Sequence, residues 1–159
     1  MKKCVECGFR GGLGRTTVRH VLECGDRTFA ATIPAFKCSK CGETYTEAVD
    51  HARAQLEAAR RLADAGEVNG AGFRFMRHAL GMRALQLAQL LGVAAETVSR
   101  WETGGRDVDK LAWATIGALV TDRLGERTTT ETHLRAIQSP KPLAKTVRLE
   151  VTATTDAAE

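Results

Sequence analysis

The sequence lacks any long hydrophobic run, and this absence excludes several classes of protein. No stretch of its 159 residues approaches the roughly 18 consecutive apolar residues that a membrane-spanning helix needs, so we expect no membrane partner. The basic start MKKCVECGFR is not followed by the apolar segment that a secretory signal carries. We therefore expect a cytoplasmic protein.

Aromatic residues are also scarce, at 5% of the chain, although 43% hydrophobic and 26% charged residues are typical of a soluble globular protein. The net charge of +4 permits nucleic-acid binding without requiring it. Basic residues predominate in residues 1–46 and 71–127, whereas acidic residues predominate in residues 47–70. This pattern indicates two modules joined by a linker helix.

Four of the five cysteines form two C-x-x-C pairs, Cys4 with Cys7 and Cys38 with Cys41, each followed by a glycine. Two such pairs present four thiolates that can surround one tetrahedral Zn²⁺, and the glycine permits a tight turn with positive φ. We predict one structural zinc ion per chain, which would supply folding energy that a small module with few aromatics lacks. The alternatives are a thioredoxin-like redox site, for which no βαβ pattern is present, and a disulfide framework, which the expected compartment disfavours.

The two pairs are separated by 30 residues, more than the commonest spacing in zinc sites of this kind. Within this insert, TTVRHVLE and RTFAATIPAF are strand-like, and CGDR between them indicates a turn. An antiparallel hairpin would return the chain to its start and bring the pairs together. We expect Cys24 to be a lone surface thiol in that turn, and neither His20 nor His51 to be a metal ligand.

The segment TEAVDHARAQLEAARRLADAGE predicts a helix within residues 47–70 that ends at Gly66. Its apolar stripe is thin and rich in alanine. We favour a solvated connector over a helix that recognises a partner. The residues of the stripe are Val49, Ala52, Leu56, Ala59 and Ala63.

Four helical patterns follow from Phe73 onward: FRFMRHAL, ALQLAQLLG, VAAETVSRWETGG and DKLAWATIGALVTDRL. The second and third are short and meet at a glycine turn, which makes them a helix-turn-helix candidate. Helices this short are not stable alone in water, so they must share a core. The residues that we expect in that core are Phe73, Met76, Leu80, Leu87, Ala88, Leu91, Val98, Trp101, Leu111, Trp113, Ile116, Leu119 and Val120.

The stretch LGMRALQLAQLLGVAAETVSRWETGGR resembles the helix-turn-helix of lambda-repressor-like (Xre-type) regulators. CVECG, a hairpin and then IPAFKCSKCGETY are similar to the YgiT-type zinc finger. The two modules in this order resemble the MqsA-type antitoxin family over roughly residues 1–127. The matching residues in the helix-turn-helix are Leu87, Ala88, Leu91, Gly92, Val93, Thr97, Val98, Ser99, Arg100, Trp101, Glu102 and Gly104.

This resemblance implies a homodimeric repressor that binds a palindromic operator in double-stranded DNA and regulates its own operon. It also implies a zinc module that binds and neutralises a toxin, typically one that cleaves RNA. Many chains of this architecture have no known toxin. The alternative is therefore a standalone Xre-type regulator whose zinc module binds another protein or a ligand.

The expected fold is a two-domain α+β chain. It comprises a small zinc-bound β-hairpin domain in residues 1–46, a linker helix in 47–70 and an all-α, lambda-repressor-like domain in 71–138. Residues 139–159 are a tail of uncertain structure. ERTTTETHLRAIQS would add a helix for dimerisation, and KTVRLEVT alternates as an edge strand does, without an assigned partner.

The resemblance places the second helix of the motif in the major groove. We expect Arg100 to donate two hydrogen bonds to a guanine, with a phosphate contact or a surface ion pair as the alternative. Glu96 replaces an asparagine that is common in the family; it can accept from cytosine, or it orients Arg100. The full set of expected DNA contacts is Arg83, Glu96, Thr97, Ser99, Arg100 and Arg106, with Thr97 and Ser99 either binding phosphates or capping the helix.

We also expect structural or DNA-contact roles for several other polar residues. Glu102 is expected to hold the following glycine turn by accepting backbone N–H groups, and Arg74, Arg77 and Lys110 are further candidates for phosphate contacts. Ala84 stands where many Xre-type domains have a glutamine that touches DNA. We expect no enzyme activity, because no general base accompanies the cysteines and a four-thiolate zinc has no open position for a substrate.

Overall fold

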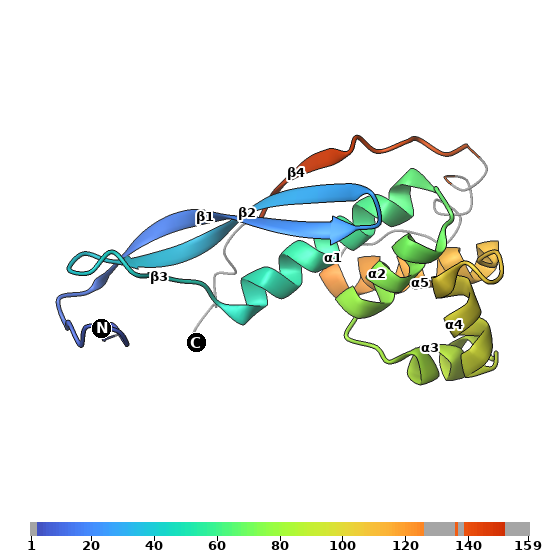
Figure 1. The fold of residues 1–159 in the computed structure, drawn as a ribbon, viewed down its shortest axis with the longest axis horizontal. Coiled ribbons are helices and arrows are strands. Elements are labelled where there is room, and N and C mark those ends of the chain that lie inside the picture. The colour runs from blue at the N-terminus through green and yellow to red at the C-terminus, as the bar shows by residue number, and fades with distance from the viewer. Residues whose placement is uncertain (1–2, 126–135, 137–138, 152–159) are drawn as a thin grey trace.

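The structure of the protein, a computed structural model, describes residues 3–125, 136 and 139–151. One small sheet and a group of helices form a mixed α and β structure (Figure 1), as expected for the fold class. No described helix is both long enough and apolar enough to span a membrane. The elements are β1 (Leu13–Cys24), β2 (Arg27–Cys38), β3 (Thr44–Tyr45), α1 (Ala48–Ala65), α2 (Gly70–Ala79), α3 (Ala84–Leu91), α4 (Ala95–Thr103), α5 (Lys110–Leu124) and β4 (Thr146–Glu150).

Strands β1 and β2 form the expected antiparallel hairpin, whose turn uses the positive φ of Gly25. The register runs from Cys24 opposite Arg27 to Leu13 opposite Cys38, so the hairpin returns the chain to the N-terminal segment. Strands β3 and β4 both pair with β2, β3 antiparallel near its end and β4 parallel over residues 28–32. The KTVRLEVT segment therefore has a partner that the sequence did not reveal.

Helix α1 is not the solvated connector that we expected. Its residues Ala54, Ala58 and Leu62 are buried against the sheet, in a cluster with Phe29 and Ile33. Figure 1 shows α1 running along the hairpin, with α2 and α5 on its other side. The helix is therefore an internal layer of the molecule.

The second buried stripe of α1 faces the helices. Ala59 and Ala63 are fully buried in the cluster that contains the cores of α2 to α5, whereas Val49 and Ala52 of the expected stripe are exposed. A single stripe was expected because alanine adds little to a hydrophobic pattern. Two alanine stripes allow both layers to approach the helix backbone closely.

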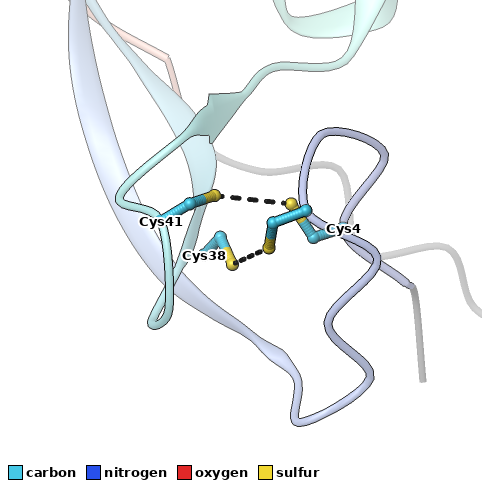
Figure 2. Close-up of side chains that lie close together, drawn as sticks. Cys4, Cys38 and Cys41 are labelled. Carbon is cyan, nitrogen blue, oxygen red and sulfur yellow. Dashed lines mark hydrogen bonds between the residues drawn. The ribbon is translucent and has the colours of Figure 1, made fainter.

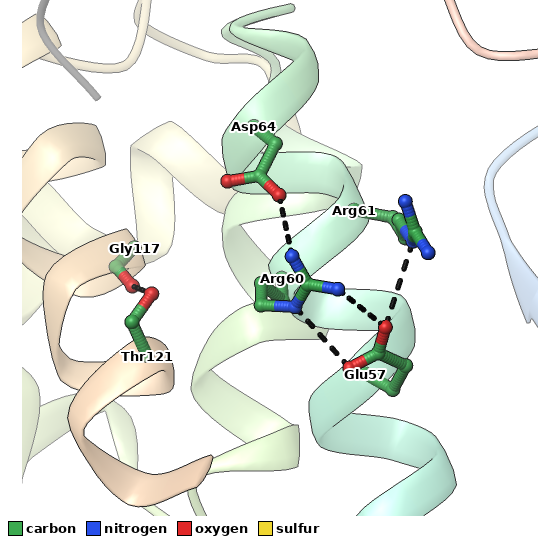
Figure 3. A network of polar contacts seen from close by, with 6 residues as sticks. All are labelled: Glu57, Arg60, Arg61, Asp64, Gly117 and Thr121. Carbon is green, nitrogen blue, oxygen red and sulfur yellow. Dashed lines mark hydrogen bonds and ion pairs between the residues drawn. The ribbon is translucent and has the colours of Figure 1, made fainter. Parts of the chain in front are cut away.

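The remaining side of α1 carries charged residues (Figure 3). The Arg60 guanidinium lies 2.6 Å from a Glu57 oxygen and 3.0 Å from an Asp64 oxygen, and Arg61 lies 3.6 Å from Glu57. Pairs at this spacing stabilise an isolated helix by about 0.2–0.5 kcal/mol each. The side chains of these four residues are 19–47% exposed, so this side of the helix is partly open to water, unlike its two alanine stripes.

Helices α2 to α5 share one hydrophobic core, largely as expected. Asn69 and Asp109 cap α2 and α5 by accepting from backbone N–H groups, at 2.8 and 2.9 Å. Thr121 of α5 is buried, and its hydroxyl donates to the Gly117 carbonyl at 3.1 Å (Figure 3). The expected core residues that are buried are Phe73, Met76, Leu80, Leu87, Ala88, Val98, Trp101, Trp113, Ile116 and Val120; Leu91 and Leu119 are partly buried.

Leu111 was expected in this core, but its side chain is 65% exposed. The core of α5 is instead formed by Ala112, Trp113 and Ile116, which turn Leu111 outward at the start of the helix. The prediction failed because the apolar residues of α5 extend around more than one face of the helix.

The segment before β4 is hydrogen-bonded to the end of α1 and to Glu67, which follows that helix. Lys141 N–H donates to the carbonyl of Ala65 at 2.9 Å, and Leu143 N–H donates to Glu67 at 3.2 Å. Glu67 also forms an ion pair with Arg27 at the hairpin turn. The helix expected in ERTTTETHLRAIQS lies almost wholly outside the described residues.

Candidate functional site

The two cysteine pairs lie in backbone loops of the same design. In each loop the N–H of the first cysteine donates to the carbonyl five residues later, at 3.0 Å for Cys4 and 2.8 Å for Cys38. The glycine that follows each pair donates back to the carbonyl of the first cysteine, at 3.0 and 2.9 Å. Gly8 and Gly42 have φ angles of 71° and 78°, a region that glycine adopts easily. The expected glycine turns are confirmed.

The four cysteine sulfurs lie together, all within 4.8 Å of one another (Figure 2). The Sγ atoms of Cys4 and Cys41 are 3.6 Å apart, and those of Cys7 and Cys38 are 3.7 Å apart. A tetrahedral metal with metal–sulfur bonds of about 2.3 Å requires sulfurs about 3.8 Å apart. The cluster can therefore hold a metal ion, as the spacing of the pairs predicted.

Tyr45, the one tyrosine of the chain, is part of this site although the sequence interpretation did not include it. Its hydroxyl lies 3.0 Å from Cys4 Sγ. Hydrogen bonds from the Cys7 backbone and from the Tyr45 hydroxyl lower the pKa of the Cys4 thiol to about 6. The pKa of Cys38 is lowered as well, chiefly by a hydrogen bond from the Cys41 backbone. The loops thus favour the thiolate, the form that binds metals, at Cys4 and Cys38. Burial and hydrogen bonds with the other three cysteines instead raise the pKa of Cys41 to about 12.

Cys24 is separate from this cluster, and the expectation of a surface thiol was wrong. Its side chain is buried at the end of β1, among the residues that pack against α1. Burial raises the pKa of the Cys24 thiol to about 11. A neutral, buried thiol is unreactive, so Cys24 has a packing role.

His20 and His51 are close together and partly buried. His20 Nε2 lies 3.4 Å from His51 Nδ1, and His51 Nε2 lies 2.7 Å from the Thr46 hydroxyl. Burial, followed by the charge of His51, lowers the pKa of His20. Among the described residues no third metal-ligating side chain completes a site here, so the pair serves as a contact between β1 and α1.

At the other end of the molecule, α3 and α4 meet at a tight turn (Figure 1). Gly92 ends α3 with a φ of 67°, and Val93 N–H donates to the carbonyl of Ala88 at 2.9 Å. Val98 and Trp101 anchor one face of α4 in the core, as expected, and the rings of Trp101 and Phe73 pack edge to face at 5.6 Å.

The opposite face of α4 is exposed and polar. Glu96, Ser99 and Arg100 are spaced three and four residues apart, so they share one face, and all three are exposed. Among the described residues, Arg100 forms no ion pair within 4 Å. Thr97 is half-buried and lines a groove between α4 and α5. The structure therefore brings three of the four α4 residues onto one accessible face.

The two other candidate DNA contacts flank this helix. Arg83 is exposed at the start of α3, where its N–H donates to the Gln86 side chain at 2.7 Å. Arg106 is exposed just after α4, and its N–H donates to the carbonyl of Arg100 at 3.2 Å.

Arg77 and Glu102 correct two expectations. Arg77 Nε and Nη2 donate to the two carboxylate oxygens of Glu102 at 2.6 and 2.8 Å, and Nη1 donates to the Met82 carbonyl at 2.7 Å. Their side chains are 8% and 9% exposed. Arg77 is therefore not placed to contact phosphate, and Glu102 binds α2 rather than the glycine turn. Partners 25 residues apart leave no local sequence signal, so the pairing was missed.

No protein-family model matches this chain, and no curated protein or solved structure matches it significantly. The resemblance seen in residues 1–127 therefore stays a prediction. The structure itself presents two candidate sites. One is the four-cysteine cluster at one end of the sheet, and the other is the exposed polar face of α4.

Replacing Glu102 with alanine should lower the free energy of unfolding by about 3–5 kcal/mol, because the Arg77 guanidinium would be left buried without its partner. Urea denaturation followed by circular dichroism measures this loss. Glu96→Ala, which removes an exposed carboxylate from the same helix, is the control and should change stability by no more than about 0.5 kcal/mol. Equal effects of the two changes would contradict the structural role of the ion pair.

Proposed function

We propose that the protein is a sequence-specific DNA-binding repressor that acts as a homodimer on a palindromic operator. The observation that carries this proposal is the anchored helix α4, whose Val98 and Trp101 are buried while Glu96, Ser99 and Arg100 are exposed on one face. A short helix, a glycine turn and a second helix of this kind fit a helix-turn-helix, in which the second helix enters the major groove. In this proposal α2 to α5 form a lambda-repressor-like domain.

The exposed side chains suit particular contacts with DNA. The Arg100 guanidinium is available for two hydrogen bonds to guanine, a contact worth about 1–3 kcal/mol of discrimination. Glu96 can only accept a hydrogen bond, for example from the amino group of cytosine. The Ser99 hydroxyl can donate a hydrogen bond to a phosphate that lies close to the helix. Arg83 and Arg106, at the two sides of the motif, add positive charge that attracts the phosphates.

The buried ion pair between Arg77 and Glu102 supports this use of α4. Glu102 lies in the last turn of α4 and Arg77 lies on α2, so two short hydrogen bonds fix the end of the proposed reading helix against its neighbour. Side chains that read bases must be held in a defined position before DNA arrives. The ion pair and the packing of Trp101 on Phe73 supply that rigidity.

We further propose that the four cysteines hold one structural Zn²⁺ per chain. Thiolate ligands in a tetrahedral arrangement suit zinc, and the bonds that zinc forms to them would add folding energy to a segment with a small core. Cys4 and Cys7 come from the N-terminal loop, whereas Cys38 and Cys41 come from the end of β2, so this site would join the two. Four protein ligands leave no position for a substrate, which supports a protein without enzyme activity.

The surface beside the cysteine loops offers a contact site for a partner of the zinc module. Beside the cysteine loops, Val5 is 81% exposed, and a small hollow is lined by Leu13, Phe36 and Tyr45 among others. Exposed apolar groups of this kind support a protein partner. With the resemblance to MqsA-type chains, this favours a cytoplasmic antitoxin of a type II system that regulates its own operon.

The second candidate is a standalone regulator whose zinc module binds another protein or a ligand. A short toxin-like reading frame beside the gene would favour the antitoxin, and its absence would favour the regulator. Both candidates require the same zinc site and the same DNA-reading helix, so the two experiments that follow apply to either.

Metal analysis of the purified protein should find one zinc ion per chain. Cys38→Ser should lose the zinc and the order of the hairpin, because it removes one of four ligands that lie within 4.8 Å of one another. Cys24→Ser is the matched control: it should retain the metal, since Cys24 lies outside the cluster. Iron in place of zinc, or no metal in the unmodified protein, would overturn the assignment.

Arg100→Ala should weaken binding to the preferred duplex about 5- to 150-fold relative to an unrelated duplex, because a bidentate contact with guanine is lost. Fluorescence anisotropy at a fixed salt concentration measures both affinities. Arg123→Ala removes an exposed arginine from the last turn of α5 and should leave the ratio unchanged. If Arg100→Ala retained full selectivity with normal zinc content, α4 would not be the reading helix.

A further inference from the structure

A groove of about 550 Å³ opens beside α4, between the turn that precedes this helix and the first turns of α5. The groove adjoins the proposed DNA-reading face. Glu96, Ser99 and Arg100 are not among its lining residues, whereas Thr97 and Arg106 are. The apolar part of its lining comprises Leu91, Val93, Ala94, Trp101, Leu111 and Ala112.

Leu111 stands at this groove as an exposed apolar side chain. It is the second residue of α5, and 65% of it is exposed, although the next residues, Ala112 and Trp113, are buried. A large apolar side chain next to an apolar hollow forms a projection and a cavity within a single patch. Exposed apolar patches of this kind mark contact surfaces.

Two charges of opposite sign line the same groove. Arg106 precedes α5 and Asp109 caps it, and both residues are exposed. One oxygen of Asp109 accepts from the Ala112 N–H at 2.9 Å, so the carboxylate is held in place at the exposed start of α5. The patch therefore carries a positive and a negative group beside its apolar projection and cavity.

This surface carries an apolar projection together with an apolar hollow, and a positive group together with a negative one. A surface of this kind can pair with an identical copy of itself. In a two-fold symmetric interface the same patch of each subunit faces the other, so a projection meets a cavity twice and each positive group meets a negative one. A small ligand or an unrelated protein would require neither the exposed Leu111 nor this paired arrangement of charges. The observations thus favour a second copy of the chain as the occupant.

We propose that this groove is the contact surface between two copies of the chain, with Leu111 of each copy seated in the groove of the other. Arg106 then faces Asp109 of the partner subunit. This inference rests on the proposed function, which requires a dimer. An axis beside α4 would place two copies of that helix on one side of the molecule, as a palindrome with half-sites roughly 34 Å apart requires.

The test compares two exposed leucines at equivalent positions. Leu111 and Leu85 are each the second residue of a helix, 65% and 56% exposed, and only Leu111 lines the groove. The unmodified protein should be a dimer by analytical ultracentrifugation. Leu111→Gln should raise the dissociation constant of the dimer at least about tenfold, whereas Leu85→Gln should leave it unchanged.

A second variant tests the charges. Arg106→Glu places two negative groups opposite each other across the axis and should weaken the dimer as well, whereas Arg123→Glu, at the far end of α5, should not. The exposure of all four side chains means that each variant should fold, which circular dichroism checks. A monomeric unmodified protein, or a Leu111→Gln protein with an unchanged dissociation constant, would overturn the proposal.

Binding to a single operator half-site separates this inference from the proposed function. A Leu111→Gln protein that dissociates but still prefers its half-site supports both. An unmodified protein whose dimer is weakened by Leu111→Gln, but which selects no DNA sequence, supports the contact surface and overturns the repressor.

Discussion

The close packing of two layers against the alanine-rich helix α1 is the constraint on which the rest of the structure depends. Ala54 and Ala58 on one side and Ala59 and Ala63 on the next are fully buried, between the sheet and the core of α2 to α5. A larger side chain at any of these four positions would push a layer away and leave a gap elsewhere, because protein interiors are close-packed. The position of the cysteine cluster relative to α4 therefore follows from α1, and residues 139–151 reinforce it by crossing the end of this helix to reach β2.

Some polar side chains are buried and hold elements together, whereas others are exposed on the surface and accessible to a ligand. The Arg77 and Glu102 side chains are buried and pair with each other, whereas Glu96 and Arg100 on the exposed face of α4 are accessible to a ligand. In the cysteine loops, polar groups also have a structural role. Hydrogen bonds from the backbone and from the Tyr45 hydroxyl stabilise the thiolate of Cys4 without a metal ion. In the account proposed here, zinc fixes one end of the molecule and the buried ion pair fixes the helix that reads DNA at the other.

The features that could be predicted from the sequence are those with a local signal. Each cysteine pair carries its own glycine turn, the hairpin is set by strand-like residues around CGDR, and the buried face of α4 follows from the spacing of Val98 and Trp101. The features that were missed depend on distant or weak signals. The second stripe of α1 consists of alanine, the partners of the buried ion pair are 25 residues apart, and β4 pairs in parallel with a strand more than a hundred residues earlier. Leu111 was placed in the core because several faces of α5 are apolar, and only the packed structure shows which face is turned outward.

The central claim, that two copies of α4 read one palindrome, is tested most directly by selecting bound sequences from a pool of random duplex DNA with the zinc-loaded protein. We expect enrichment of a two-fold symmetric sequence whose half-sites lie about one helical turn apart, roughly 34 Å, with a G·C pair at a fixed position in each half-site for Arg100. Recovery of no enriched sequence, or of a motif without two-fold symmetry, would contradict it.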